Sequence, residues 1–262
     1  MFAEVSNTIL AALGGANPLV VLWIALLVYF IAGIIKGTLG IGFPTVAVSL
    51  LAQFTDARSA ILLVIMPMFF TNLWQVWRCG LFLGVIRQIR LLLIIMLVII
   101  AVFSQLSSIV SVDLLAAVLG FIVALYALHS LFATPLVLDP AWDKPAQIIA
   151  GVSAGVMGGL VSVWAPPILL YLNARQLSKE QFVATAGVIL LMGSSVLLFS
   201  YQVSGVLSYG LFLCSMLLIV PSLVGFVVGE YLRRSLSAQR FQRVLLWFFF
   251  IMGLNLIRRA LS

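Results

Sequence analysis

The sequence predicts an all-α polytopic membrane protein built from two homologous halves. The first observation is composition: 64% of the 262 residues are hydrophobic, 8% are charged, and the mean hydropathy is +1.28. Because so few polar residues cannot cover a water-facing surface, lipid must cover most of the molecule. Large soluble domains are therefore excluded. The second observation is an apolar segment, interrupted by glycine and proline, that occurs twice.

Each half is expected to hold one broken segment and three whole spans, because about 20 apolar residues cross the hydrocarbon core. In the first half, residues 1–134, the broken segment is 18–53 and the spans are 59–77, 91–106 and 114–132. A polar stretch with prolines and aspartates, 135–145, is the linker. In the second half, residues 146–262, the broken segment is 146–172 and the spans are 181–201, 207–232 and 241–257.

The broken segments are predicted to be re-entrant hairpins, because as single helices they would be about 50 Å and 40 Å long. Hairpins divide the Lys and Arg residues outside them ten against three, whereas single crossings divide them seven against six. The positive-inside rule favours the hairpins, with both termini periplasmic in a bacterial inner membrane. The cytoplasmic set is Arg78, Arg87, Arg90, Lys144, Arg175, Lys179, Arg233, Arg234, Arg240 and Arg243, and the opposite set is Arg58, Arg258 and Arg259.

This arrangement predicts where a substrate would bind. A hairpin plus three spans is an odd number of crossings, so the halves form inverted repeats and their broken tips meet near the midplane. Non-helical backbone is tolerated at that depth only where it lines a cavity. The pattern therefore indicates a transporter that works by alternating access around this site.

The glycine pattern supports the repeat and favours an anion. Three glycines of the first half, at 33, 37 and 40, recur with the same spacing at 151, 155 and 158. Glycine lets the chain leave the helix, and Pro44 suits the first turn of the next one. Amides near Thr45 would then point into the cavity, where the helix dipole favours an anion. The alternative is that these glycines only pack helices together.

The candidate substrate-binding residues flank the two breaks and the spans that follow them. They are Lys36, Gly37, Thr38, Gly40, Gly42, Pro44, Thr45, Asn72, Gln75, Gly155, Gly158, Gly159, Ser162, Trp164, Pro166, Ser194 and Ser195. Two interpretations of Lys36 stay open: a cation inside the site, or a side chain that snorkels to the interface. The polar residues of the later spans could hold the anion or join helices to one another.

Other functions are excluded by what the sequence lacks. The basic residues end apolar runs instead of forming a nucleic-acid-binding stretch, so the expected partners are a small anion and membrane lipid. One histidine and two isolated cysteines predict no metal and no cofactor. No nucleophile with a base is evident, so we expect no enzyme. An anion channel and a carrier for small carboxylates remain alternatives, and the sequence leaves open a monomer or a homodimer.

The chain resembles the TauE/SafE family of membrane permeases, the sulfite exporters. The resemblance rests on residues 33–42 with Pro44, on the glycines of 151–159 with Pro166, and on the two-half organisation of the whole chain. It implies export of sulfite or organosulfonates.

Overall fold

The computed structural model describes residues 18–79, 83–106, 109–132, 137–233 and 238–261. Every regular element in these ranges is a helix, so the predicted all-α class is confirmed. Helical segments long and apolar enough to cross a membrane number five in this part of the chain: Leu19–Leu39, Ala57–Cys79, Val112–Phe132, Glu180–Val203 and Tyr209–Leu232. The chain is therefore a multi-pass membrane protein.

The helices follow the apolar runs of the sequence. Those from the first half are α2 (Pro18–Leu39), α3 (Phe43–Leu51), α4 (Ala57–Leu63), α5 (Ile65–Cys79), α6 (Leu83–Gln88), α7 (Arg90–Leu106) and α8 (Val112–Phe132). After a short turn at Pro140–Trp142 come α9 (Asp143–Val161), α10 (Ala165–Ala174), α11 (Lys179–Val203), α12 (Tyr209–Leu217), α13 (Ile219–Leu232) and α14 (Ala238–Leu261).

Polar caps mark where several helices begin. Asp56 accepts a hydrogen bond from the Ser59 amide at the start of α4. Ser178 and Gln181 form a reciprocal capping box at the start of α11. These caps satisfy amides that have no partner within the helix.

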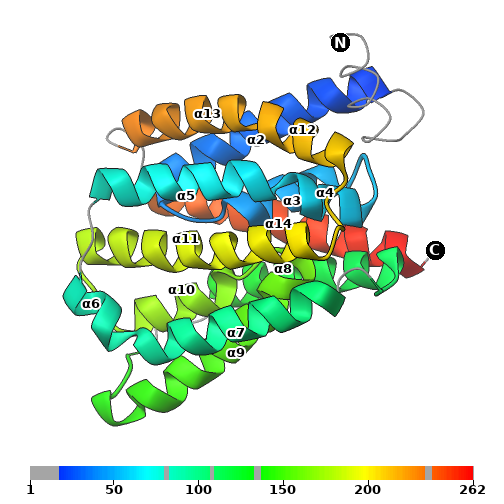
Figure 1. Ribbon diagram of the computed structural model, residues 1–262. Coiled ribbons are helices and arrows are strands. Elements are labelled where there is room, and N and C mark those ends of the chain that lie inside the picture. Colours follow the sequence, from blue (N-terminus) through cyan, green and yellow to red (C-terminus); the bar gives the residue numbers. More distant parts are fainter. Residues whose placement is uncertain (1–17, 80–82, 107–108, 133–136, 234–237, 262) are drawn as a thin grey trace.

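The long helices run between two ends of the molecule, seen at the right and left of Figure 1. We call the right-hand end the Asp113 end, where α8 begins and α14 finishes. The left-hand end is the Arg175 end, where α5, α10 and α13 finish. The chain goes toward the Arg175 end along α2 and back along α3; it goes toward the Asp113 end along α9 and back along α10.

Glycines bring α2 and α13 into backbone contact. A Cβ on Gly33 would overlap the carbonyl oxygen of Ser222, and one on Gly37 would overlap that of Phe226. On the facing helix, Gly225 lies equally close to the Phe30 carbonyl. Small residues commonly allow this approach between membrane helices. For Gly37, a predicted site residue, these contacts fit the helix-packing interpretation.

The helix α9 packs against α7 in a corresponding way. A Cβ on Gly151 would lie 3.0 Å from the carbonyl oxygen of Leu92, and one on Gly155 would lie 2.6 Å from the Cβ of Ile99. A Cβ on Gly159 would lie 2.7 Å from the Cβ of Phe103. Gly155 and Gly159 are thus occupied in packing these two helices.

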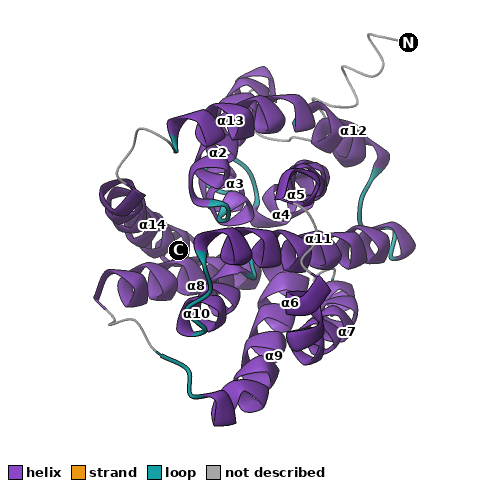
Figure 2. Cartoon of the chain, turned by 90° about the vertical axis from the view of Figure 1, so that its left-hand side faces the viewer, coloured by secondary structure: helices purple, strands orange, loops and turns teal. Residues whose placement is uncertain are grey.

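At the centre of the bundle, α5 contacts α11, α12 and α13 (Figure 2). It also contacts α2 through the side chain of Lys36. Five basic residues of the predicted cytoplasmic and periplasmic sets cannot be placed at either end of the molecule. Arg234 lies outside the described residues, as do the side chains of Lys179, Arg240, Arg243 and Arg259.

Candidate functional site

The chain leaves helix α2 through two glycines in a left-handed conformation. Gly40 has φ 83° and Gly42 has φ 90°, and α3 begins at Phe43 with Pro44 in its first turn. L residues other than glycine rarely adopt such angles. A Cβ on Gly42 would find no atom within 4 Å, whereas one on Gly40 would lie 3.3 Å from Val183. There is therefore open space beside Gly42.

Lys36, one turn before this break, points into the bundle. Its side chain is only 1% exposed. Its Nζ donates to Thr71 Oγ1 at 3.1 Å and to the side-chain oxygen of Asn72. The same atom lies 5.9 Å from the ring centroids of both Phe43 and Phe226, a distance at which aromatic faces attract a cation. The ammonium is thus held by neutral groups.

Asn72 extends these contacts to α11. Its Nδ2 donates to the Leu190 carbonyl oxygen at 3.0 Å and to Ser194 Oγ at 3.2 Å. About one turn along α5, Gln75 Nε2 donates to the Val183 carbonyl oxygen at 2.9 Å. The Gln75 Oε1 atom is buried and accepts no hydrogen bond from any described residue. Lys36, Asn72 and Ser194 therefore form one connected polar cluster across α2, α5 and α11, which we call the Lys36 cluster.

The second break is built from different residues. Helix α9 ends at Val161, and Ser162 follows with φ 57°, which is unusual for a residue with a side chain. Its Oγ lies 3.3 Å from the hydroxyl oxygen of Tyr201. Trp164 is fully buried, and its indole nitrogen has no hydrogen-bond partner among the residues that the structure describes. Helix α10 then begins at Ala165, with Pro166 in its first turn.

The two breaks are not in the register that the glycine spacing indicated. The spacing pairs Gly40 with Gly158, but Gly158 lies inside α9. A Cβ on Gly158 would lie 2.7 Å from the Trp164 ring, so this glycine makes room for the indole. The position where α9 ends is Ser162, which precedes Pro166 by the same interval that separates Gly40 from Pro44.

The remaining predicted residues lie outside the cluster. Thr38 Oγ1 donates to the Ile34 carbonyl at 2.8 Å, within its own helix. Ser195 Oγ likewise bonds within α11, to the Leu191 carbonyl at 2.8 Å. Thr45 is buried in the first turn of α3.

Sequence reasoning missed several contacts of the site. Phe226 and Tyr201 come from distant parts of the chain, and no local pattern marks them. Arg233 is another such contact: its Nε and Nη2 donate to the Gly37 carbonyl at 3.2 and 2.9 Å. A cation at the carboxyl end of α2 also interacts favourably with the helix dipole. Arg233 therefore ties the end of α13 to α2 beside Lys36.

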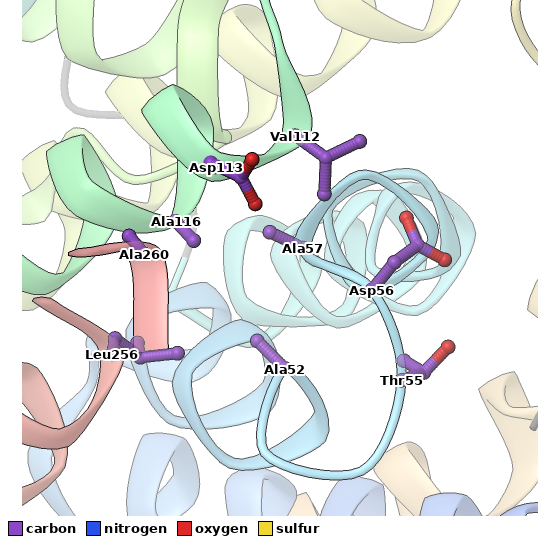
Figure 3. Close-up of a pocket in the computed structure, with 9 residues that line it drawn as sticks. All are labelled: Ala52, Thr55, Asp56, Ala57, Val112, Asp113, Ala116, Leu256 and Ala260. Atoms are coloured by element: carbon purple, nitrogen blue, oxygen red, sulfur yellow. The ribbon is translucent and has the colours of Figure 1, made fainter. Parts of the chain in front are cut away.

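A separate pocket of about 150 Å³ opens at the Asp113 end (Figure 3). The residues that line it are Ala52, Thr55, Asp56, Ala57, Val112, Asp113, Ala116, Leu256 and Ala260. Its charged side chains are the carboxylates of Asp56 and Asp113, so the pocket does not suit an anion. In the described part of the chain, no group of three His, Cys, Asp or Glu side chains could hold a metal ion.

Comparison with known families identifies the chain. The family model described as sulfite exporter TauE/SafE matches residues 25–256, which include both breaks and the Lys36 cluster. Comparisons with curated proteins and with solved structures gave no match. The match confirms the resemblance read from the glycine and proline motifs: this chain belongs to the sulfite exporter TauE/SafE family of membrane transporters.

Proposed function

We propose that the chain exports small sulfur-containing anions, such as sulfite or organosulfonates, by alternating access around the Lys36 cluster. The observation that carries the proposal is a buried lysine side chain that forms no ion pair with a described acidic residue. Among the described residues, the polar partners of Lys36 are the neutral side chains of Thr71 and Asn72.

A bound anion would offset the cost of this arrangement. An ionised group removed from water is costly unless a group of opposite charge accompanies it, and an ionisable residue at membrane depth is a functional candidate by default. The open space beside Gly42 lies at the break that follows Lys36. The amino end of α3 begins there and favours negative charge. Both features are consistent with a small anion between Lys36 and the break.

Inverted repeats with re-entrant broken helices form part of the proposal. The close pair α2 and α13 combines the broken segment of one half with the third element of the other, and α9 with α7 is the reciprocal pair. In addition, α5 and α11, which occupy equivalent places in the two halves, pack on each other. Reciprocal pairs of this kind are expected from a pseudo-two-fold axis in the membrane plane.

The charge distribution supports one orientation. Described basic side chains at the Arg175 end are Arg78, Arg87, Arg90, Lys144, Arg175 and Arg233, and those at the Asp113 end are Arg58 and Arg258. We therefore assign the Arg175 end to the cytoplasm and both termini to the periplasm of a bacterial inner membrane.

A ligand-stabilisation screen tests the proposed function. The purified protein in detergent is heated with sulfite, with methanesulfonate or sulfoacetate, and with the matched carboxylates acetate and malonate. Sulfite and the sulfonates should raise the melting temperature, because a ligand that binds only the folded state stabilises it. The Lys36→Met variant should lose this shift. Equal stabilisation by the carboxylates would favour the carboxylate carrier instead, and no stabilisation by any of these anions would contradict the proposal.

A further inference from the structure

Among the described residues, the two hydrogen-bond acceptors of Lys36 are one fewer than an ammonium group needs. A lysine ammonium has three N–H donors, whereas a neutral amine has two. Lys36 Nζ donates to Thr71 Oγ1 and to the side-chain oxygen of Asn72. The rings of Phe43 and Phe226 are the other groups beside it. Among the described residues, these two acceptors match the two N–H donors of a neutral amine, whereas an ammonium requires a third acceptor.

These two acceptors are held in orientations that keep them acceptors. The Thr71 hydroxyl donates its own hydrogen to the Met68 carbonyl oxygen at 3.1 Å. The Asn72 amide nitrogen is engaged with α11, at Leu190 and Ser194, so its oxygen faces Lys36. Neither group can supply a negative charge.

The charged groups of α13 interact with residues other than Lys36. On α13, Glu230 lies 3.9 Å from Arg78 of α5, and Arg233 donates to the carbonyls that end α2. Phe43 of α3 and Ser194 of α11 are neutral. On α2 itself, Tyr29 lies two turns before Lys36 and is buried. Within the described part of the chain, no carboxylate forms an ion pair with Lys36.

We infer, on the basis of the proposed function, that Lys36 binds the substrate anion together with one proton and releases both on the other side of the membrane. On loading, the neutral amine accepts a proton, and the new N–H donates to an oxygen of the anion, which becomes the third acceptor. On release, the anion leaves, and the proton returns to water from the Nζ atom. A monovalent anion is then carried with no net movement of charge.

Proton and anion fluxes in proteoliposomes test this coupling. The substrate is methanesulfonate, because it stays ionised at every pH used and carries no proton of its own. A pH-sensitive dye inside the vesicles reports protons, and valinomycin with potassium sets the membrane potential. The wild-type protein should move protons with methanesulfonate in equal amounts, and a change in membrane potential should leave the rate unchanged.

The Lys36→Arg variant separates binding from proton transfer. An arginine stays protonated in proteins, so it can hold the anion but cannot release a proton. We expect exchange of methanesulfonate for methanesulfonate to persist while net flux is lost. Arg87→Gln, which removes an exposed charge from α6, is the control and should keep both the exchange and the net flux of methanesulfonate.

The outcomes distinguish the coupling from the function. Methanesulfonate flux that follows the membrane potential and moves no protons would overturn the coupling and leave the transporter in place, as would net flux by Lys36→Arg. The wild-type measurement decides this even when the variant does not fold. Absence of both sulfite and methanesulfonate flux in the wild type would instead contradict the proposed function.

Discussion

Asn72 and Ser194 are joined across α5 and α11 by a hydrogen bond of 3.2 Å, from the amide nitrogen to the hydroxyl oxygen. The oxygen of the same amide accepts from Lys36. Contact with α11 therefore orients the Asn72 oxygen that faces Lys36, so helix α11 acts on Lys36 through Asn72.

Removal of the Ser194 hydroxyl should weaken anion binding moderately. In Ser194→Ala, Asn72 keeps its bond to the Leu190 carbonyl, so we expect a loss of about 1 kcal/mol, or about fivefold in affinity. Titration of the thermal shift with methanesulfonate measures this loss. Ser195→Ala is the control, because Ser195 bonds only within its own helix. Equal losses in the two variants would contradict the role given to Ser194.

Alanine at Gly33 should destabilise the protein without a specific effect on the ligand. The new Cβ would overlap the backbone of α13, and overpacking of this kind costs about 1–3 kcal/mol. The melting temperature should fall while the shift on adding anion persists. In Gly84→Ala the Cβ would meet no atom within 4 Å, and alanine favours a helix, so no destabilisation is expected there. An unchanged melting temperature for Gly33→Ala would contradict the backbone contact between α2 and α13.

Two substitutions at Ser162 separate its backbone from its hydroxyl. Glycine adopts φ 57° without strain, so Ser162→Gly should be about 1 kcal/mol more stable than Ser162→Ala. Both variants lose the hydroxyl that lies beside Tyr201. If that hydroxyl serves the anion, both should lose affinity equally while their melting temperatures differ. Full affinity in Ser162→Gly would restrict Ser162 to a role in ending the helix.

The proposed orientation is tested by labelling single cysteines. Asp113 and Lys144 are exposed at opposite ends of the molecule, and Cys79 and Cys214 would first be replaced. A membrane-impermeant reagent added to intact cells should label a cysteine at 113 and spare one at 144. Labelling of both positions from the same side would exclude the hairpin topology and the inverted repeats that depend on it.

Much of the fold follows from local features of the sequence. Apolar runs of suitable length predict helices because only helices satisfy their own backbone in lipid, and the described helices lie along those runs. The interruption near Gly40 and Gly42 was also predictable, because glycine permits the positive φ observed there. The place of Pro44 in the first turn of α3 follows from the fixed backbone angle of proline.

The partners of each residue were less predictable. Helix α9 continues past Gly158, which packs under Trp164, and ends at Val161 inside the predicted broken segment, so the glycine spacing alone does not mark the helix end. Phe226 lies beside Lys36 only because α13 packs on α2, and such packing depends on the whole bundle. Ser162, a residue predicted from the sequence, stands four residues before Pro166, as Gly40 stands before Pro44.

Counterflow of radiolabelled sulfite tests the central claim, that Lys36 binds the transported anion, most directly. Vesicles loaded with unlabelled sulfite and the wild-type protein should take up external label rapidly and saturably. The Lys36→Met variant should take up label at about one tenth of the wild-type rate or at a lower rate, because a hydrogen bond to a charged group contributes about 1.5–3 kcal/mol. Uptake by a folded Lys36→Met protein at the wild-type rate would contradict the claim, and so would a wild-type flux that does not saturate, as expected of an open channel.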